Sequence, residues 1–186
     1  MDAFNYLSVL LSIILGLAIT QILQGYRSLL LSRAMVQGGL LSIIWSVLLL
    51  FVVTQAWWAS FALRTHTDWT FLEFGIVLLQ MILIYMMAAV VLPDFKDEHA
   101  IDLADHFDRK RGVFFGFLLA AAATSLAKDL VLDGSLPSAA NTAFHAVLAV
   151  AAIIGILVAA HWAQLVIAGG IALGFLLYVL FLFARL

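Results

Sequence analysis

The chain has no cysteine and few charged residues. Only 11% of its 186 residues are charged, whereas a soluble domain carries about a quarter, so the charges are too few to cover a globule in water. The apolar share of 66% and the mean hydropathy of +1.15 must therefore face another medium, and a lipid bilayer fits. Without cysteine the chain contains no disulfide, no thiolate nucleophile and no cysteine-ligated metal.

Basic patches and catalytic signatures are lacking as well. The net charge of −2 and the pI near 6.2 exclude the basic face of a nucleic-acid binder. The sequence contains no GxSxG, HExxH, GxxxxGK[ST] or GxGxxG motif. Because no Lys or Arg precedes Arg27, the first apolar run is expected to be a retained helix rather than a cleavable signal. These absences favour a non-enzymatic protein with no cofactor.

Long uncharged runs predict an all-α integral membrane protein with about six transmembrane helices. A helix needs about 20 residues to cross about 30 Å of hydrocarbon, whereas barrel strands would be shorter and alternate polar with apolar residues. One polytopic domain is expected to fill residues 1–186. Its expected spans are residues 4–25, 40–63, 71–92, 112–132, 139–160 and 164–184.

A short amphipathic connector helix, residues 94–110, is expected between the third and fourth spans. Its apolar positions recur at helical spacing, and the opposite face is charged. The apolar face is Ala100, Leu103, Ala104 and Phe107, and the charged face is Glu98, Asp102, Asp105 and Arg109. This pattern is typical of a helix that lies on the cytoplasmic membrane surface or docks under the bundle.

Basic residues and tryptophans give the expected orientation. One side of the membrane would hold six basic residues and the other three, so both termini are expected on the non-cytoplasmic side of the cell membrane. The six are Arg27, Arg33, Lys96, Arg109, Lys110 and Arg111, and the three are Arg64, Lys128 and Arg185. Trp57, Trp58 and Trp69 at one end, with Trp45 and Trp162 at the other, are interpreted as interfacial anchors.

Small residues mark possible packing faces. In the first span they recur at every fourth position, as Ser8, Ser12, Gly16, Thr20, Gln24, Ser28 and Ser32. This stripe suggests a helix buried among neighbours. Two GxxxG pairs, Gly112/Gly116 and Gly170/Gly174, indicate either packing inside the bundle, the favoured interpretation, or a homo-oligomer face. Membrane lipids are the other expected partners, and nucleic acid is not one.

Polar residues at membrane depth are the candidate binding site. Three of them are placed by counting turns: Glu73 lies near the start of the third span, Lys128 near the end of the fourth and His145 near the start of the fifth. Polar groups inside a membrane usually face the bundle interior or water. The full candidate set for ligand or ion binding is Glu73, Lys128, Asp129, His145, Asn5, Gln55, Asn141 and Tyr178.

The alternative to a binding site is a structural ion pair at the helix ends, with the lysine side chain reaching to the membrane interface. Gln21, Gln80 and Gln164 indicate further polar groups at inward depth.

A second, weaker candidate is a metal site in the connector. His99, Asp102 and His106 share one helix face at a spacing that could hold a divalent cation. A fourth ligand would be needed, and a solvated polar face is the favoured interpretation.

The function expected from these residues is binding or translocation of a small solute, ion or proton through an outer-facing polar cavity. The alternative is a non-catalytic membrane subunit or scaffold that acts through helix faces and the cytoplasmic connector. A third possibility is a lipid-modifying enzyme with His145 and either Glu73 or Asp129 as acid–base residues.

Overall fold

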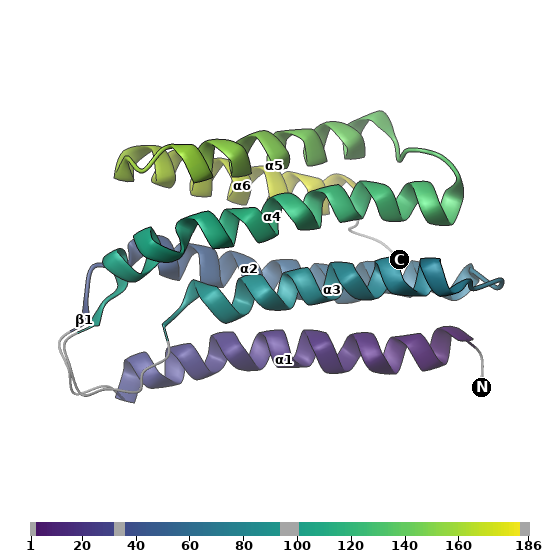
Figure 1. The fold of residues 1–186 in the computed structure, drawn as a ribbon, viewed down its shortest axis with the longest axis horizontal. Coiled ribbons are helices and arrows are strands. Elements are labelled where there is room, and N and C mark those ends of the chain that lie inside the picture. Colours follow the sequence, from purple (N-terminus) through teal and green to yellow (C-terminus); the bar gives the residue numbers. More distant parts are fainter. Residues whose placement is uncertain (1–2, 32–35, 94–100, 183–186) are drawn as a thin grey trace.

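The computed structural model describes residues 3–31, 36–93 and 101–182 of the chain, and this part forms an antiparallel bundle (Figure 1). The helices are α1 (Ala3–Leu31), α2 (Leu40–Ser60), α3 (Phe71–Val91), α4 (Leu103–Asp133), α5 (Ala139–Leu157) and α6 (His161–Leu182), and a 3-10 helix, η1 (Phe61–Thr65), extends α2. All six α-helices are long and apolar enough to cross a membrane. The expected all-α transmembrane bundle is confirmed, and the chain is a multi-pass membrane protein.

Side-chain caps fix where three helices begin. Thr70 and Glu73 form a reciprocal capping box at the start of α3. Asp102 accepts hydrogen bonds from the backbone N–H groups of Ala104 and Asp105, and Ser138 accepts one from that of Asn141. These side chains satisfy backbone donors that a helix start leaves without partners.

The connector and the fourth span are one helix. Residues 94–100 lie outside the described part, but residues 103–110 are the first turns of the 31-residue α4, so a separate helix ending at residue 110 is wrong. The basic run Arg109-Lys110-Arg111 does not interrupt the helix, because it contains no residue that stops one. Leu103 and Phe107 are buried. These first turns therefore dock on the end of the bundle.

A short backbone pairing holds the same end together. The two-residue strands β1 (Val36–Gln37) and β2 (Ile101–Asp102) pair in parallel. Gly39 follows β1 with φ of 97°, a conformation that L side chains rarely adopt, and a Cβ at this glycine would lie 2.5 Å from the Leu103 side chain. The α1–α2 connection can therefore pass closely over the start of α4.

Most of the small-residue stripe of α1 faces away from the bundle, although Ser12 accepts a hydrogen bond from Nε1 of Trp57 in α2. The helix buries Leu7, Leu11, Leu15, Ala18 and Ile22 against α2 and α3, whereas stripe positions from Ser12 to Gln24 are exposed. A Cβ at Gly16 would meet nothing within 4 Å. The expectation of a buried stripe is wrong, because the apolar seam, rather than the hydroxyl row, is the face that packs against neighbours.

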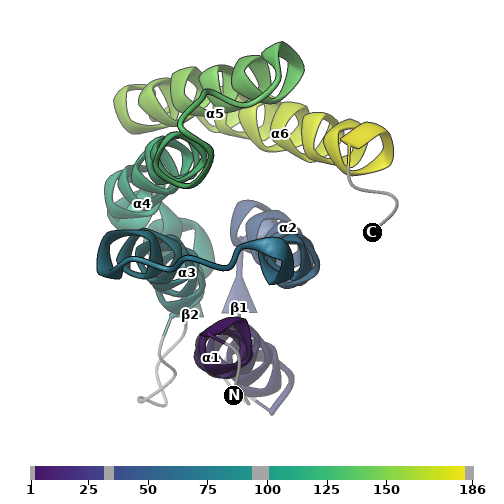
Figure 2. The same ribbon diagram turned by 90° about the vertical axis from the view of Figure 1, so that its right-hand side faces the viewer.

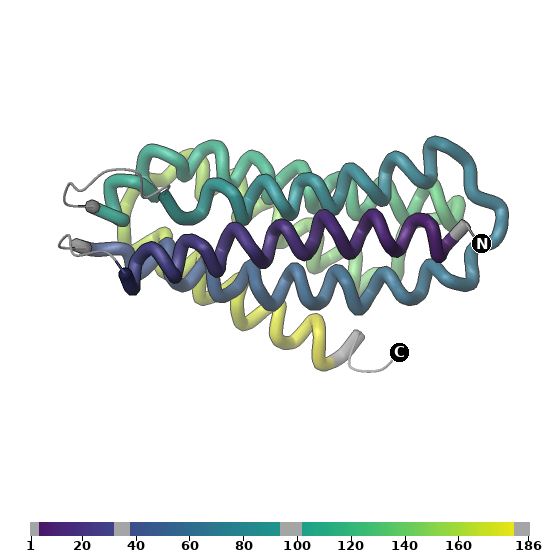
Figure 3. Tube along the Cα trace, turned by 90° about the horizontal axis from the view of Figure 1, so that it is seen from below, coloured from purple at the N-terminus to yellow at the C-terminus, as the bar shows by residue number. Residues whose placement is uncertain are grey.

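The bundle is layered. Viewed end-on, α1 lies on one side, followed by α2 and α3, then α4, then α5 and α6 (Figure 2). The helix α6 packs on α5 and α2 and runs obliquely to the rest, so its C-terminal half splays outward (Figure 3). Five helices, α2 to α6, thus surround the middle of the molecule.

Most glycines of the two GxxxG pairs are not covered by a neighbouring helix. A Cβ placed on Gly112, Gly116 or Gly170 would meet no atom within 4 Å, and one on Gly174 would touch Phe144 only at 3.7 Å. The favoured interpretation, close packing inside the bundle, is therefore wrong for three of the four glycines. Their role as a homo-oligomer face stays a prediction.

Candidate functional site

A cavity of about 440 Å³ lies between α2, η1, α3, α4, α5 and α6. Its lining is polar toward the end where α4 finishes and α5 begins, and apolar toward the opposite end. We call the polar end the mouth and the apolar end the floor. The mouth residues are Gln55, Thr65, His66, Ser125, Lys128, Asp129, Asp133, Asn141, His145 and Tyr178, and the deeper ones include Trp45, Leu48, Leu49, Met81, Ile84, Met87, Phe114 and Leu118.

Lysine and aspartate form an ion pair at the mouth. The Nζ of Lys128 lies 3.4 Å from Oδ1 of Asp129, and these side chains are 23% and 18% exposed. Adjacent residues on a helix do not normally face each other, so both side chains must bend toward the same space. They can do so because the cavity lies beside this last part of α4.

A second polar group joins α5 to α6. The Nδ1 of His145 is 2.8 Å from the carbonyl oxygen of Asn141, one turn earlier. The Tyr178 hydroxyl donates to Oδ1 of Asn141 at 3.1 Å. The ring of Tyr178 stacks on Phe144, with centroids 4.2 Å apart. These contacts hold α6 beside α5 and orient three polar side chains around the mouth.

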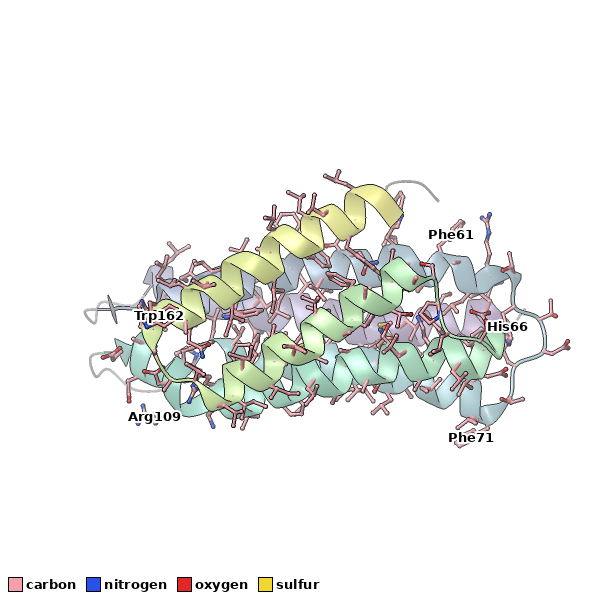
Figure 4. The ribbon with its side chains drawn as sticks, turned by 90° about the horizontal axis from the view of Figure 1, so that it is seen from above. Phe61, His66, Phe71, Arg109 and Trp162 are labelled. Carbon is pink, nitrogen blue, oxygen red and sulfur yellow. The ribbon has the colours of Figure 1, made fainter. Side chains whose placement is uncertain are left out.

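Glu73 is near the cavity without lining it. Its carboxylate is used in the capping box with Thr70, and Oε1 lies 3.5 Å from Nε2 of His66, which does line the mouth. Figure 4 shows His66 in the connection between Phe61 and Phe71, at the end of the bundle opposite Arg109 and Trp162. Glu73 can therefore position His66 but does not itself contact the cavity space.

Six of the eight candidate residues are brought together. Gln55, Lys128, Asp129, Asn141, His145 and Tyr178 line the cavity. Glu73 is separated from it by His66. Asn5 is exposed on α1, and among the described residues none of α1 contributes to the lining. Counting turns gave the correct height for Asn5 but could not give its direction around the helix axis.

Aromatic rings close the floor. Trp45 lies edge-on to Phe114 and Phe115, with centroid distances of 5.0 and 5.4 Å, and Phe107 packs beside both phenylalanines. All four rings are at most 2% exposed. The interpretation of Trp45 as an interfacial anchor is wrong: it is a core residue, and its indole Nε1 has no partner within the described part of the chain.

The floor is braced by a group that sequence reasoning missed. Arg111, in α4, donates through Nη1 to the carbonyl oxygens of Gly155 at 2.6 Å, Ile156 at 3.1 Å and Val158 at 2.8 Å. Gln164 is fully buried and donates to the carbonyls of Gly155 and Val158. Together they satisfy the acceptors that the end of α5 leaves unpaired, and the cation also suits a helix C-terminus. No spacing in the sequence indicates this pairing, because Arg111 lies 44 residues from Gly155.

The other inward glutamines have separate roles. Gln21 donates to the Tyr85 hydroxyl at 3.4 Å, between α1 and α3. Gln80 lines the cavity between mouth and floor, and its Oε1 is buried without a partner among the described residues. A row of glutamines at one depth is therefore absent from the part of the chain that the structure describes.

Two residues of the candidate metal site, Asp102 and His106, make other contacts. Asp102 caps α4 with its carboxylate, and His106 places Nε2 3.0 Å from the Val90 carbonyl. His99 lies outside the described residues. Within the ranges described, no group of three or more His, Asp or Glu side chains could hold a metal ion.

Comparison of the chain with protein-family models, with curated proteins and with solved structures finds no match.

Proposed function

We propose that the protein binds a small molecule in this cavity, which the molecule enters through the mouth. The observation that carries the proposal is the convergence of polar side chains from α2, α4, α5 and α6 on one end of an internal space of about 440 Å³. Ligand pockets usually measure about 300–1,000 Å³ and combine apolar walls with a few placed polar groups. Ionisable groups inside a transmembrane bundle cost free energy, and where they occur they usually mark a ligand or ion site.

The two ends of the cavity favour binding over passage. At the mouth, the lining includes the exposed residues Thr65 and Asp133. At the floor, Trp45 and Phe114 pack ring against ring. A solute could therefore enter from the mouth, but it would have to displace packed aromatic side chains to leave through the floor.

The mouth is proposed to face the non-cytoplasmic side. This orientation rests on the bias of Lys and Arg, since six of the nine are expected at the floor end of the bundle. The ligand would then be captured from outside the cell or from the outer leaflet.

A thiol-labelling pair tests whether the cavity is open. The chain has no cysteine, so Ser125→Cys introduces a single thiol into the cavity lining. Ala123→Cys is the matched control, because it lies about 3 Å away along α4 on the exposed face. In membranes, a charged, water-soluble methanethiosulfonate reagent is expected to modify Ser125→Cys and to leave Ala123→Cys, which faces lipid, unmodified. Labelling of Ala123→Cys alone, or of neither, would contradict the proposal.

A membrane scaffold is the second candidate. It is favoured by the uncovered glycines of α4 and α6, where a second helix could approach closely. Gly170→Leu should then convert an oligomer to a monomer on gel filtration in mild detergent. An unchanged elution volume would remove this candidate.

A further inference from the structure

The chemistry of the cavity wall changes along its length. Below Ser125, the α4 face that lines the cavity consists of Ala122, Ala121, Leu118 and Phe114. Opposite it lie apolar side chains of α2 and α3, among them Leu48, Met81 and Ile84. Two buried polar atoms there have no partner among the described residues, Oε1 of Gln80 between mouth and floor and Nε1 of Trp45 at the floor. They lie at different depths, so water beside either one would meet fewer than the two to four polar partners that it needs. The deep part of the cavity is therefore suited to hydrocarbon.

The mouth has the opposite character, and its two partly buried charges, Lys128 and Asp129, balance. The third charge of its lining, Asp133, is exposed. Lys128 and Asp129 neutralise each other, and Asn141, His145 and Tyr178 add uncharged donors and acceptors. A ligand head with a net charge would pair with one member of the ion pair and strand the other, which is costly at this burial. A head that carries no net charge can use both members.

Length and volume limit the ligand further. From Lys128 to Phe114 the cavity follows α4 for about 21 Å at 1.5 Å per residue. Its volume of about 440 Å³ lies in the lower part of the range for ligand pockets. The space is thus long and narrow, a shape that accommodates one extended hydrocarbon chain.

We infer that the ligand is a single-chain amphiphile whose head, without net charge, lies at Lys128 and Asp129 and whose tail extends to the aromatic floor at Trp45. This inference rests on the proposed function, and it adds the ligand's class and its direction in the cavity.

Fluorescence quenching tests the direction of the ligand. Trp57, Trp58, Trp69 and Trp162 are changed to Phe, so that Trp45, buried at the floor, is the one emitter. The detergent-solubilised protein is titrated with a single-chain phosphocholine that carries a nitroxide either at the tail end or beside the head. The tail-end nitroxide is expected to quench Trp45 several times more than the head nitroxide, and the quenching should saturate.

Matched variants separate binding in the cavity from contact with the micelle. Ala122→Phe fills the cavity, whereas Ala123→Phe adds the same ring to the exposed face. The first should abolish tail-end quenching and the second should retain it. Displacement by an unlabelled phosphocholine amphiphile provides the same control in the parent protein, should Ala122→Phe not fold. Quenching that is equal for both labels, or that resists displacement, would overturn the inference.

The charge of the head is tested by competition. An alkyl phosphocholine should displace the labelled ligand at lower concentration than an alkyl carboxylate or an alkyltrimethylammonium of equal chain length. Better displacement by either charged amphiphile would overturn the assignment of a head without net charge.

The inference and the proposed function can fail separately. If Ser125→Cys is labelled while no nitroxide quenches Trp45, the amphiphile is excluded but the proposed function stands. If Ser125→Cys is unreactive as well, both fail.

Discussion

The mouth and the floor are the two ends of one cavity, but they differ in how closely their side chains pack. At the floor, rings fill the space between α2 and α4, and Arg111 and Gln164 pair with the end of α5. At the mouth, Lys128, Asp129 and His145 surround space that side chains leave unfilled. The difference indicates that stability is concentrated at the floor and binding capacity at the mouth, because tight packing and an accessible site exclude each other.

A large effect is expected where Gly155 of α5 packs against Phe115 of α4 at the floor. A Cβ at Gly155 would lie 2.7 Å from ring carbons of Phe115, whereas one at Gly170 would meet nothing within 4 Å. Gly155→Val should cost about 3 kcal/mol, the upper end for overpacking. Gly170→Val should leave folding almost unchanged. Thermal midpoints of the two solubilised variants measure the difference, and equal midpoints would show that the floor is not tightly packed.

Removing the hydrogen bonds from Arg111 to the end of α5 should have the next largest effect on stability. Arg111→Gln removes donors from three carbonyl groups, and losing charge-assisted hydrogen bonds costs about 2 kcal/mol. Arg109→Gln removes the same charge from an exposed position, where its ion pair with Asp105 contributes less than about 1 kcal/mol. A thermal midpoint that falls as far for Arg109→Gln as for Arg111→Gln would refute the bracing role.

A smaller effect is expected at the mouth. Lys128→Met strands the carboxylate of Asp129, and at this partial burial the cost should be about 1–2 kcal/mol, between values for exposed and buried pairs. Adding Asp129→Asn should restore the thermal midpoint while ligand binding stays lost. Lys110→Met, at an exposed position of the same helix, serves as the control. If the double variant bound the phosphocholine amphiphile normally, the pair would be structural and no part of the site.

The smallest effect is expected for the conservative change Trp45→Phe. Its indole N–H has no partner in the described part of the chain, so Trp45→Phe loses ring volume but no hydrogen bond. A cost of about 1 kcal/mol is expected, against about 3–5 kcal/mol for Trp45→Ala. Equal losses from the two changes in thermal unfolding would indicate that the indole N–H is used after all.

Much of this fold follows from the sequence, because apolar length alone separates six spans. Heights along the helices were also predictable, since each residue adds a fixed rise, and so Lys128, His145 and Asn141 were expected at one level. The direction in which each side chain points around its helix axis could not be predicted from the sequence. Asn5 points outward, Gly16 faces away from the bundle and Trp45 is buried, and only tertiary packing decides such directions.

Labelling from each side of the membrane tests most directly whether the cavity opens only at the mouth. A single cysteine at Ser125, in the cavity lining, would be exposed to the same charged methanethiosulfonate reagent from each side in turn. Ser125→Cys should react only when the reagent is added on the side where α1 begins and α6 ends. Reaction of Ser125→Cys from the opposite side would contradict a closed floor and would indicate a pathway through the membrane.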